Sequence, residues 1–445
     1  MPHWQTSSKS QDMLGLMIQQ KTDPAMQIKD LITAQAQAHG FGATTAPGPM
    51  RLNAAERLQQ YNLSSRRHFW TRLAMRDVLN TPVLPIAQSA NSVDIASYQK
   101  KTSAIPVIFR GGCCVSPQPK ANSGVEVDVL PIDTSSEQQH WSTFMANAAC
   151  EITPALAAMC GQSVVNIRIT ASVQIELIYI TDKAPSTDGY HINIDVAAGV
   201  RASIDQYIYS TESAEGSACI VSRTIKLAKD ADLVDQFVGK IPAISFMQCQ
   251  QVSGNERSTY RAYQALTGGK VCRQVSELIL NEPQASAAVY GVGLANEKQR
   301  HDHTILVKHQ ASHTQSTQQV KYCVDQQALS NFTSRVYVAS GVYDIESDQL
   351  NHNLLLSNQA RALTAPELEI YADDVRCAHG ATVGALDEQA IFYLQSRGLN
   401  LQQARATLVS GFMKDLIEVF PTAACDRAQS LVDRMLARTE GCQQD

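Results

Sequence analysis

Cys377 and His379 lie two residues apart in the run CAHGATVG. In a β-strand, alternate side chains point to the same face, so this spacing places a thiol and an imidazole side by side. Both groups are good ligands for iron, but two ligands are too few for a complete iron–sulfur cluster site. The spacing therefore predicts a metal site whose remaining ligands come from elsewhere.

A hydrolase is the alternative chemistry for the same pair. A nucleophile and its base can point the same way from one strand, but the sequence offers no evident oxyanion loop and no group to orient the imidazole. The carboxylates of Asp373 and Asp374 precede the pair and could tune a metal. Paired acids at the start of a turn are more often solvated, which is the interpretation we favour.

A second cluster of imidazoles occurs in the run HDHTILVKHQASH, formed by His301, His303, His309 and His313. Four imidazoles can bind zinc or ferrous iron. The loose spacing matches no recognised metal signature, so these side chains are expected to be outward polar residues of a β-structure.

Composition narrows the classes of function. The 445 residues exceed one ordinary core and predict two or three structural units. A net charge of -5 gives no electrostatic reason to bind nucleic acid or an anionic membrane. The first residues lack the pattern of a signal peptide and no apolar run reaches transmembrane length, so a cytoplasmic protein is expected. The eleven cysteines form no C-x-x-C pair and are expected to be mostly reduced thiols.

Nucleotide binding by this chain is not expected. No phosphate-binding loop of the form G-x-x-x-x-G-K-[ST] is present, and TGGKVC at Thr267 is typical of a turn. The vicinal Cys113 and Cys114, which follow two glycines after IPVIF, also indicate a strand and a turn rather than a metal site.

Three regions are expected along the chain. Residues 1–163 are helical in pattern, with Asp23 and Asn53 as helix N-caps and a further helix over 140–159. Residues 164–385 switch to short runs of period two that are separated by turns, which predicts an all-β tract. Periodicity alone does not choose among a sandwich, a barrel and a solenoid.

Residues 386–445 are predicted to form helices. Asp387 caps the first, which stops at Gly398, and Asn400 with Gln403 opens the second. A third helix is expected over 423–438. The second helix carries an apolar stripe that must pack against the third helix or a partner, formed by Leu401, Ala404, Leu408, Phe412, Leu416 and Val419.

Several runs resemble the SufB/SufD family of the SUF iron–sulfur assembly system, and its SufD members in particular. The resemblance is carried by LEIYADDV, by the C-x-H-G-A-T-V-G run and by FYLQSRG, all within residues 354–398. Arg67 and Trp70 match a basic-aromatic family motif from which one residue is missing, and His309 followed by QSTQQVKY matches an H…S-x-Q-x-x-K pattern. The resemblance implies a mainly β fold with flanking α, in which a right-handed parallel β-helix lies between two helical regions.

The resemblance also implies a function. Such a chain is a non-catalytic subunit of the assembly scaffold that pairs with its paralogue SufB through the end of the β-helix. His379 would face a SufB cysteine where a transient iron–sulfur cluster or iron is held. The C-terminal domain would dock the ATPase SufC, two copies per complex, and the chain alone would form a homodimer. The residues expected to serve this docking are Asp387, Phe392, Tyr393, Arg397, Leu408 and Phe412.

Some alternatives stay open. Cys377 matches the family position, but a filler at the interface or in the last coil competes equally with a ligand. A SufB-type scaffold would itself accept sulfur and carry the cluster, although that paralogue is usually longer and has a glutamate-rich motif in place of CAHGATVG. A β-helix enzyme acting on polysaccharide would use Asp373 and Asp374, but such enzymes are usually secreted.

Overall fold

The structure is a computed structural model that describes residues 103–116, 119, 122–132, 153–181, 186–211 and 214–441. Most of the predicted N-terminal helical region lies outside these residues. The caps expected at Asp23 and Asn53 and the motif with Arg67 and Trp70 fall in that part.

The central region consists of strands in two facing sheets. One sheet holds the odd-numbered strands β5 (Gln174–Thr181), β7 (Arg201–Ser210), β9 (Asp232–Ile241), β11 (Thr259–Gly268), β13 (Ser286–Ala295), β15 (Gln315–Val324), β17 (Ile345–Leu355) and β19 (Val375–Ala385). The other holds β4 (Ser163–Ile169), β6 (Thr187–Val196), β8 (Ala218–Leu227), β10 (Ser245–Gly254), β12 (Val271–Leu280), β14 (Arg300–His309), β16 (Leu329–Val338) and β18 (Arg361–Ile370).

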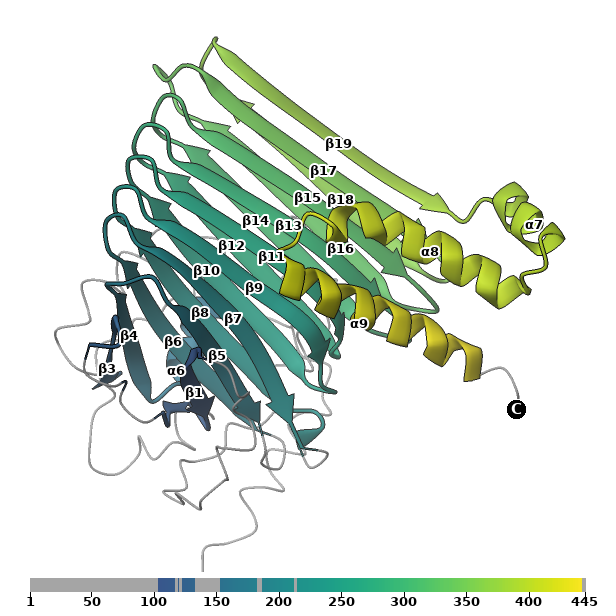
Figure 1. The fold of residues 1–445 in the computed structure, drawn as a ribbon, viewed down its shortest axis with the longest axis horizontal. Helices are drawn as coiled ribbons and strands as arrows, with labels where there is room; N and C mark the ends of the chain where they lie inside the picture. Colours follow the sequence, from purple (N-terminus) through teal and green to yellow (C-terminus); the bar gives the residue numbers. More distant parts are fainter. Residues whose placement is uncertain are drawn as a thin grey trace, which may run out of the picture.

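Successive strands alternate between the sheets, and each pairs in parallel with the strand two places further along the chain. Two strands therefore make one coil, and the coils stack as Figure 1 shows. This arrangement confirms the predicted parallel β-helix. The turns use left-handed backbone where the sequence allows it. In TGGK, for example, Gly268 and Gly269 have φ values of +80° and +72°, and a Cβ on Gly268 would collide with the Ile241 carbonyl oxygen.

Short elements begin the described part of the chain. They are β1 (Ile105–Arg110), β2 (Cys113–Cys114), β3 (Val125–Pro131) and α6 (Thr153–Cys160). β1 and β2 form the strand and turn expected around the vicinal cysteines. Strands thus occur within the range 1–163, which was expected to be mainly helical, and α6 overlaps the helix expected over 140–159. The rest of that range stays a prediction.

The interior of the β-helix is not purely apolar. Valine, isoleucine and leucine fill most inward positions, because alternate residues of each strand face inward. Polar side chains interrupt this row in the middle and last coils, and they are fully buried as well: examples are Arg223, Asp235, Gln250, Gln318 and Gln349. The free-energy cost of burying such groups depends on whether they have hydrogen-bond or ion-pair partners.

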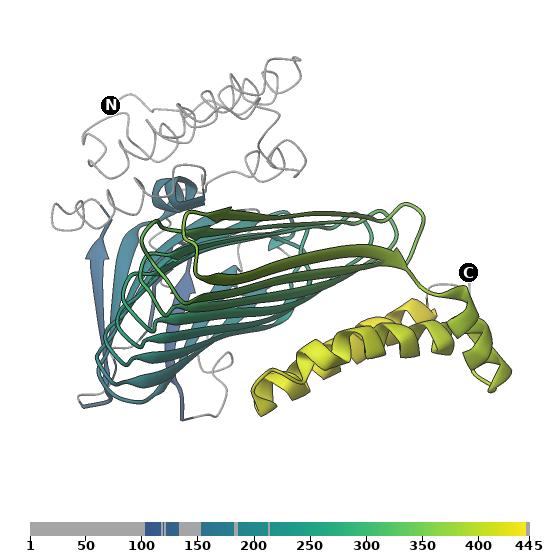
Figure 2. The same ribbon diagram turned by 90° about the horizontal axis from the view of Figure 1, so that it is seen from above.

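Three helices follow the last strand: α7 (Glu388–Ser396), α8 (Leu401–Ile417) and α9 (Thr422–Gly441). The Asp387 cap and the Asn400–Gln403 capping box are present, and Gly398 has the positive φ of a helix stop, as predicted. α8 and α9 lie beside each other along the face of the odd-strand sheet (Figures 1 and 2).

The apolar stripe of α8 is therefore covered by this chain itself. The side chains that α8 buries are Ala404, Val409, Met413, Leu416 and Ile417. They pack on α9 and on outward residues of the sheet, among them Tyr263, Leu294 and Cys323. The predicted stripe is only partly right: Leu401 and Val419 are exposed.

Candidate functional site

Cys377 and His379 lie on β19, the last strand of the odd-strand sheet. The register places Cys377 next to Ser347 of β17 and His379 next to Gln349. Ser347 and Gln349 are buried, 2% and 0% exposed, so their row faces the interior of the β-helix. Since alternate residues share a face, Cys377 and His379 lie on the same face, as the sequence predicted, and the register shows that this face continues the inward row.

The two side chains differ in their surroundings. Cys377 is half-buried and packs against the core, whereas His379 is exposed. Burial raises the pKa of the Cys377 thiol, and the charge of Asp348 raises it further. The thiol is therefore protonated at neutral pH, and it must lose this proton when it binds a metal.

The inward row is open at this end because β18 and β19 are the last strands of their sheets. Among the described strands, β19 pairs only with β17, and β18 only with β16. The side of each terminal strand that faces away from the stack has free backbone groups, and natural proteins usually cover such edges. Asp373 and Asp374 lie in the turn that joins the two strands and are exposed, in line with the interpretation that they are solvated.

The second histidine cluster lies elsewhere, and its predicted outward position is wrong. His301, His303 and His309 are at most 2% exposed and face the interior. His301 Nε2 lies 2.8 Å from the Gly268 carbonyl oxygen, and the ring nitrogens of His309 lie 2.8 and 3.0 Å from the hydroxyls of Thr314 and Ser316.

The fourth histidine, His313, is exposed and lies 2.7 Å from Asp344. Over the described part of the chain, no three or more His, Cys, Asp or Glu residues are arranged to hold a metal ion. His301, His303 and His309 are therefore part of the folded core, whereas His313 is not.

The pattern that follows His309 has a structural explanation. Ser316 contacts His309 and the Ser347 hydroxyl, at 3.0 and 2.8 Å, and Gln318 accepts a hydrogen bond from Ser334 within the interior. Lys321 points the other way and donates to Asp415 of α8 at 2.6 Å. Alternation of apolar and polar residues did not predict the contacts of Ser316, Gln318 and Lys321, because polar residues at inward positions interrupt that alternation.

The predicted docking residues lie on two helices, α7 with its N-cap and α8. Phe392 and Tyr393 on α7 are 73% and 56% exposed, and the Arg397 guanidinium lies 5.2 Å from the Tyr393 ring centre. Asp387 accepts a hydrogen bond from the Gln389 amide, so it has a structural role as helix cap. Leu408 and Phe412 are half-buried, and Phe412 packs against the sheet below Lys321.

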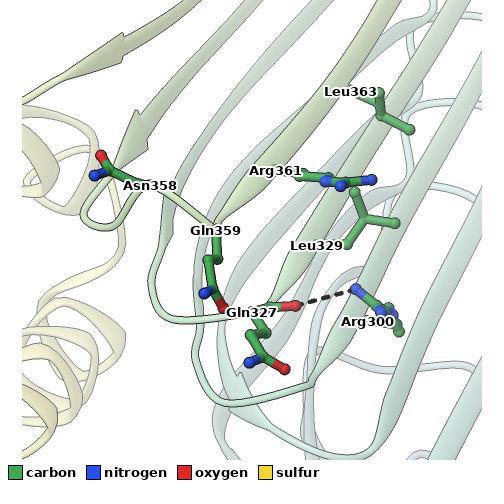
Figure 3. A pocket seen from close by; sticks show the side chains of 7 residues that line it. All are labelled: Arg300, Gln327, Leu329, Asn358, Gln359, Arg361 and Leu363. Atoms are coloured by element: carbon green, nitrogen blue, oxygen red, sulfur yellow. Dashed lines mark hydrogen bonds between the residues drawn. The ribbon is translucent and has the colours of Figure 1, made fainter.

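A surface groove of about 660 Å³ lies at the turns of the last coils, outside the Cys377–His379 row. In Figure 3, Arg300 of β14 reaches the Gln327 carbonyl oxygen, while Arg361 and Leu363 extend from β18. The groove contains neither of the predicted ligands.

Several remaining expectations concern thiols and membranes. Cys160, Cys219 and Cys249 are buried thiols, and Cys150 lies outside the described residues. No helix in the described ranges combines the length and apolar character that crossing a membrane requires.

Comparison with known proteins points to one family. The model of the family described as "SUF system FeS cluster assembly, SufBD core domain" matches residues 191–412, from the second coil to α8. The chain is 25% identical over 404 residues to the iron–sulfur cluster assembly protein SufD of Escherichia coli K12. This alignment covers 88% of this chain and 92% of that protein.

Shorter matches agree. A SufBD family protein of Synechocystis is 33% identical over 39% of this chain and 38% of its own length. One from Mycobacterium leprae is 29% identical over 34% of this chain and 40% of its own length. The β-helix, the family match and the long alignment with SufD lead to one conclusion: the chain belongs to the SufB/SufD family of the SUF iron–sulfur cluster assembly system and is SufD-like.

Proposed function

We propose that this chain is the SufD-type subunit of a SUF assembly complex. It catalyses no reaction alone, pairs with a SufB subunit through the open end of its β-helix, and binds the ATPase SufC through its C-terminal helices. The observation that carries this proposal is the position of Cys377 and His379 in the inward row of the last strand, beside an edge that pairs with no further strand among the described residues.

The cargo of this site is iron or a nascent iron–sulfur cluster. His379 offers an exposed imidazole and Cys377 a thiol that can be deprotonated, and both are iron ligands. Their chain contributes at most two ligands, so a second subunit must supply the others. A SufB cysteine that meets the open end of the coil would complete the set.

The C-terminal helices support the second contact. Phe392 and Tyr393 expose their aromatic rings on α7, whose buried side chain is Ile391. Exposed aromatic residues with a neighbouring arginine are typical of protein interfaces. SufC would dock on α7, with a second SufC on the SufB subunit.

The anchored helices suggest how ATP use reaches the site. Two ion pairs join the helices to the sheet. Lys321 of β15 pairs with Asp415 of α8, and Arg427 of α9 pairs with Asp205 of β7. A pull on the helices by a pair of SufC subunits would therefore move the β-helix as a rigid body and change the interface at His379.

Co-expression with SufB and SufC tests this function. We expect a complex of this chain, SufB and two SufC subunits on size exclusion, and ATP turnover only when SufC is present. If the chain elutes alone in the presence of both partners, or hydrolyses ATP without them, the proposed function fails.

A further inference from the structure

Three residues of the inward row are aligned across the last three odd-numbered strands. Gln318 of β15 is the register partner of Gln349 in β17, and Gln349 is the register partner of His379 in β19. Both glutamines are 0% exposed. Neighbouring strands lie about 4.8 Å apart, so these side chains stack directly on one another toward the open end.

Each of the two side-chain amides has one hydrogen-bonding atom without a partner in the described part of the chain, a donor in Gln318 and an acceptor in Gln349. Gln318 accepts a hydrogen bond from the Ser334 hydroxyl, and Gln349 donates to the Glu367 carbonyl oxygen at 3.3 Å. Within the described residues, Gln318 Nε2 and Gln349 Oε1 have no hydrogen-bond partner although both are buried. One is a donor, the other an acceptor, and they belong to adjacent strands.

A carboxamide oxygen has two acceptor positions. Gln349 Oε1 can therefore accept one hydrogen from Gln318 Nε2 below it and one from the imidazole above it. Neither hydrogen bond is formed in the structure. Buried polar atoms are rarely left without partners in native proteins, which favours both contacts.

We propose that Gln318 and Gln349 form a buried amide ladder that orients His379. Gln349 Oε1 accepts the hydrogen of one ring nitrogen, which fixes the tautomer and directs the lone pair of the other nitrogen toward the open end. This inference rests on the proposed function for the use of that lone pair, which binds the incoming metal. Histidines that bind metals usually donate their second ring nitrogen in this way. Gln349 is thus a positioning residue.

The alternative is that Gln349 only fills space in the core. Two substitutions separate the two roles. Gln349→Met keeps the size and removes the acceptor, whereas Gln349→Glu keeps an oxygen acceptor but buries a charge. If Gln349 only packs, Gln349→Glu should disturb the core around His379 more than Gln349→Met does. If Gln349 positions His379, Gln349→Met should change the tautomer of His379 more than Gln349→Glu does.

The first measurement is the tautomer of His379 in the full chain without metal. We would record nitrogen NMR spectra of ¹⁵N-histidine-labelled protein at a pH about two units above the ordinary histidine pKa, and assign the ring by its loss in His379→Ala. We expect one dominant tautomer in the unsubstituted chain and in Gln349→Glu, and a mixture in Gln349→Met. His352, whose ring contacts Thr382 on the outer face at 2.9 Å, is the internal control.

The second measurement is the affinity of the full chain for Co²⁺, followed by its visible absorption. Loss of a residue that orients a ligand typically weakens metal binding about 10- to 100-fold, which is the loss expected for Gln349→Met. Gln349→Glu should bind as well as the unsubstituted chain. Gln319→Met makes the same chemical change on β15 next to the ladder, at a half-buried residue that faces outward, and should change nothing.

Should Gln349→Met not fold, Gln318→Met removes the ladder one step away and should shift the tautomer of His379 in the same direction. The proposal is overturned if the folded Met variants keep the tautomer of His379 unchanged. It is also overturned if Gln349→Glu changes that tautomer more than Gln349→Met does. Failure of the proposed function would appear separately, as a missing complex with SufB and SufC, and would leave the tautomer result intact.

Discussion

Lys321 on β15 and Asp415 on α8 join the β-helix to its C-terminal helices. The lysine Nζ lies 2.6 and 2.8 Å from the two carboxylate oxygens and 2.8 Å from the Phe412 carbonyl oxygen. The lysine side chain is 14% exposed, so it is held more firmly than a freely solvated ion pair. Together with Arg427 and Asp205, which are 2.6 Å apart, this contact determines how the helices sit on the sheet.

Replacing Lys321 by Met should loosen α8 from the sheet. We expect a loss of about 1 kcal/mol in the stability of the docked helices, since the ion pair is partly exposed but also bonds a backbone carbonyl. Hydrogen exchange should become faster in α8 and α9 and stay unchanged in β15. Lys414→Met is the control, because Lys414 pairs with Glu418 at the surface. Equal exchange in the two variants would contradict the anchoring role.

The buried pair of Arg223 and Asp235 makes a different prediction. These side chains are 0% and 2% exposed, 2.5 Å apart, and Tyr260 donates a further hydrogen bond to Asp235. Arg223→Met should destabilise the chain by about 3–5 kcal/mol, because it leaves a buried carboxylate without its partner. Urea unfolding measures this loss.

The double substitution of Arg223→Met with Asp235→Leu should recover much of that stability, since neither charge of this pair stays buried. Arg257→Met, in an exposed ion-pair network, should have little effect. If the double variant is as unstable as the single one, packing and not charge pairing explains the loss.

Acid should destabilise the β-helix through its interior histidines. Burial lowers the pKa of His191 to about 3 and that of His303 to about 4; His301 and His309 are also lowered to about 4 by burial. Their pKa in the unfolded chain is about 6.5, so between these values the unfolded state binds more protons. Stability is then fully present above about pH 6.5 and falls as the pH drops toward 4, by about 1.4 kcal/mol per pH unit for each histidine.

The urea midpoint as a function of pH checks this dependence. His303→Gln removes one titrating group and should make the fall between these pH values shallower. A pH profile that His303→Gln does not alter would argue against the linkage.

The sequence predicted the repeating strands, the helix caps at Asp387 and Asn400 and the shared face of Cys377 and His379, because these depend on local periodicity and on short capping motifs. It placed His301, His303 and His309 on the wrong side. A period-two pattern assumes that polar residues face water, whereas this β-helix buries polar residues in its interior. The sequence predicted the packing of the α8 stripe on α9, but it did not predict the sheet face that also receives it, because the outward apolar residues of that face, such as Leu294 and Cys323, are far away in the sequence.

His379 and Cys377 should have unequal effects on the cargo. His379→Ala removes an exposed imidazole at the end of the coil, so the fold and the complex should stay intact while cluster formation is lost. Cys377→Ala should be milder, since a half-buried thiol also serves packing. The visible absorption of the anaerobically isolated complex measures the cluster. A normal cluster yield from His379→Ala would exclude this residue from the site.

The last prediction concerns α7. Removing all residues from Asp387 onward would also uncover the sheet face formed by Val238, Tyr263, Ala265, Val292 and Leu294, so lost binding would be ambiguous. Replacing Phe392 and Tyr393 together by Ser avoids this problem, since both rings are exposed and contribute little to the core.

We expect the Phe392→Ser and Tyr393→Ser double variant to keep its unfolding midpoint and to lose SufC. The measurement is a pull-down with SufB present and the SufC-binding helices of SufB removed, so that only this chain can retain the ATPase. The matched control is the pair Leu401→Ser and Val419→Ser, which removes two exposed apolar side chains from α8 and the turn after it. Loss of two exposed aromatic anchors typically weakens an interface by at least about 2 kcal/mol, or roughly 30-fold. If the α7 variant retains SufC and the control pair loses it, the docking surface lies on α8 and not on α7.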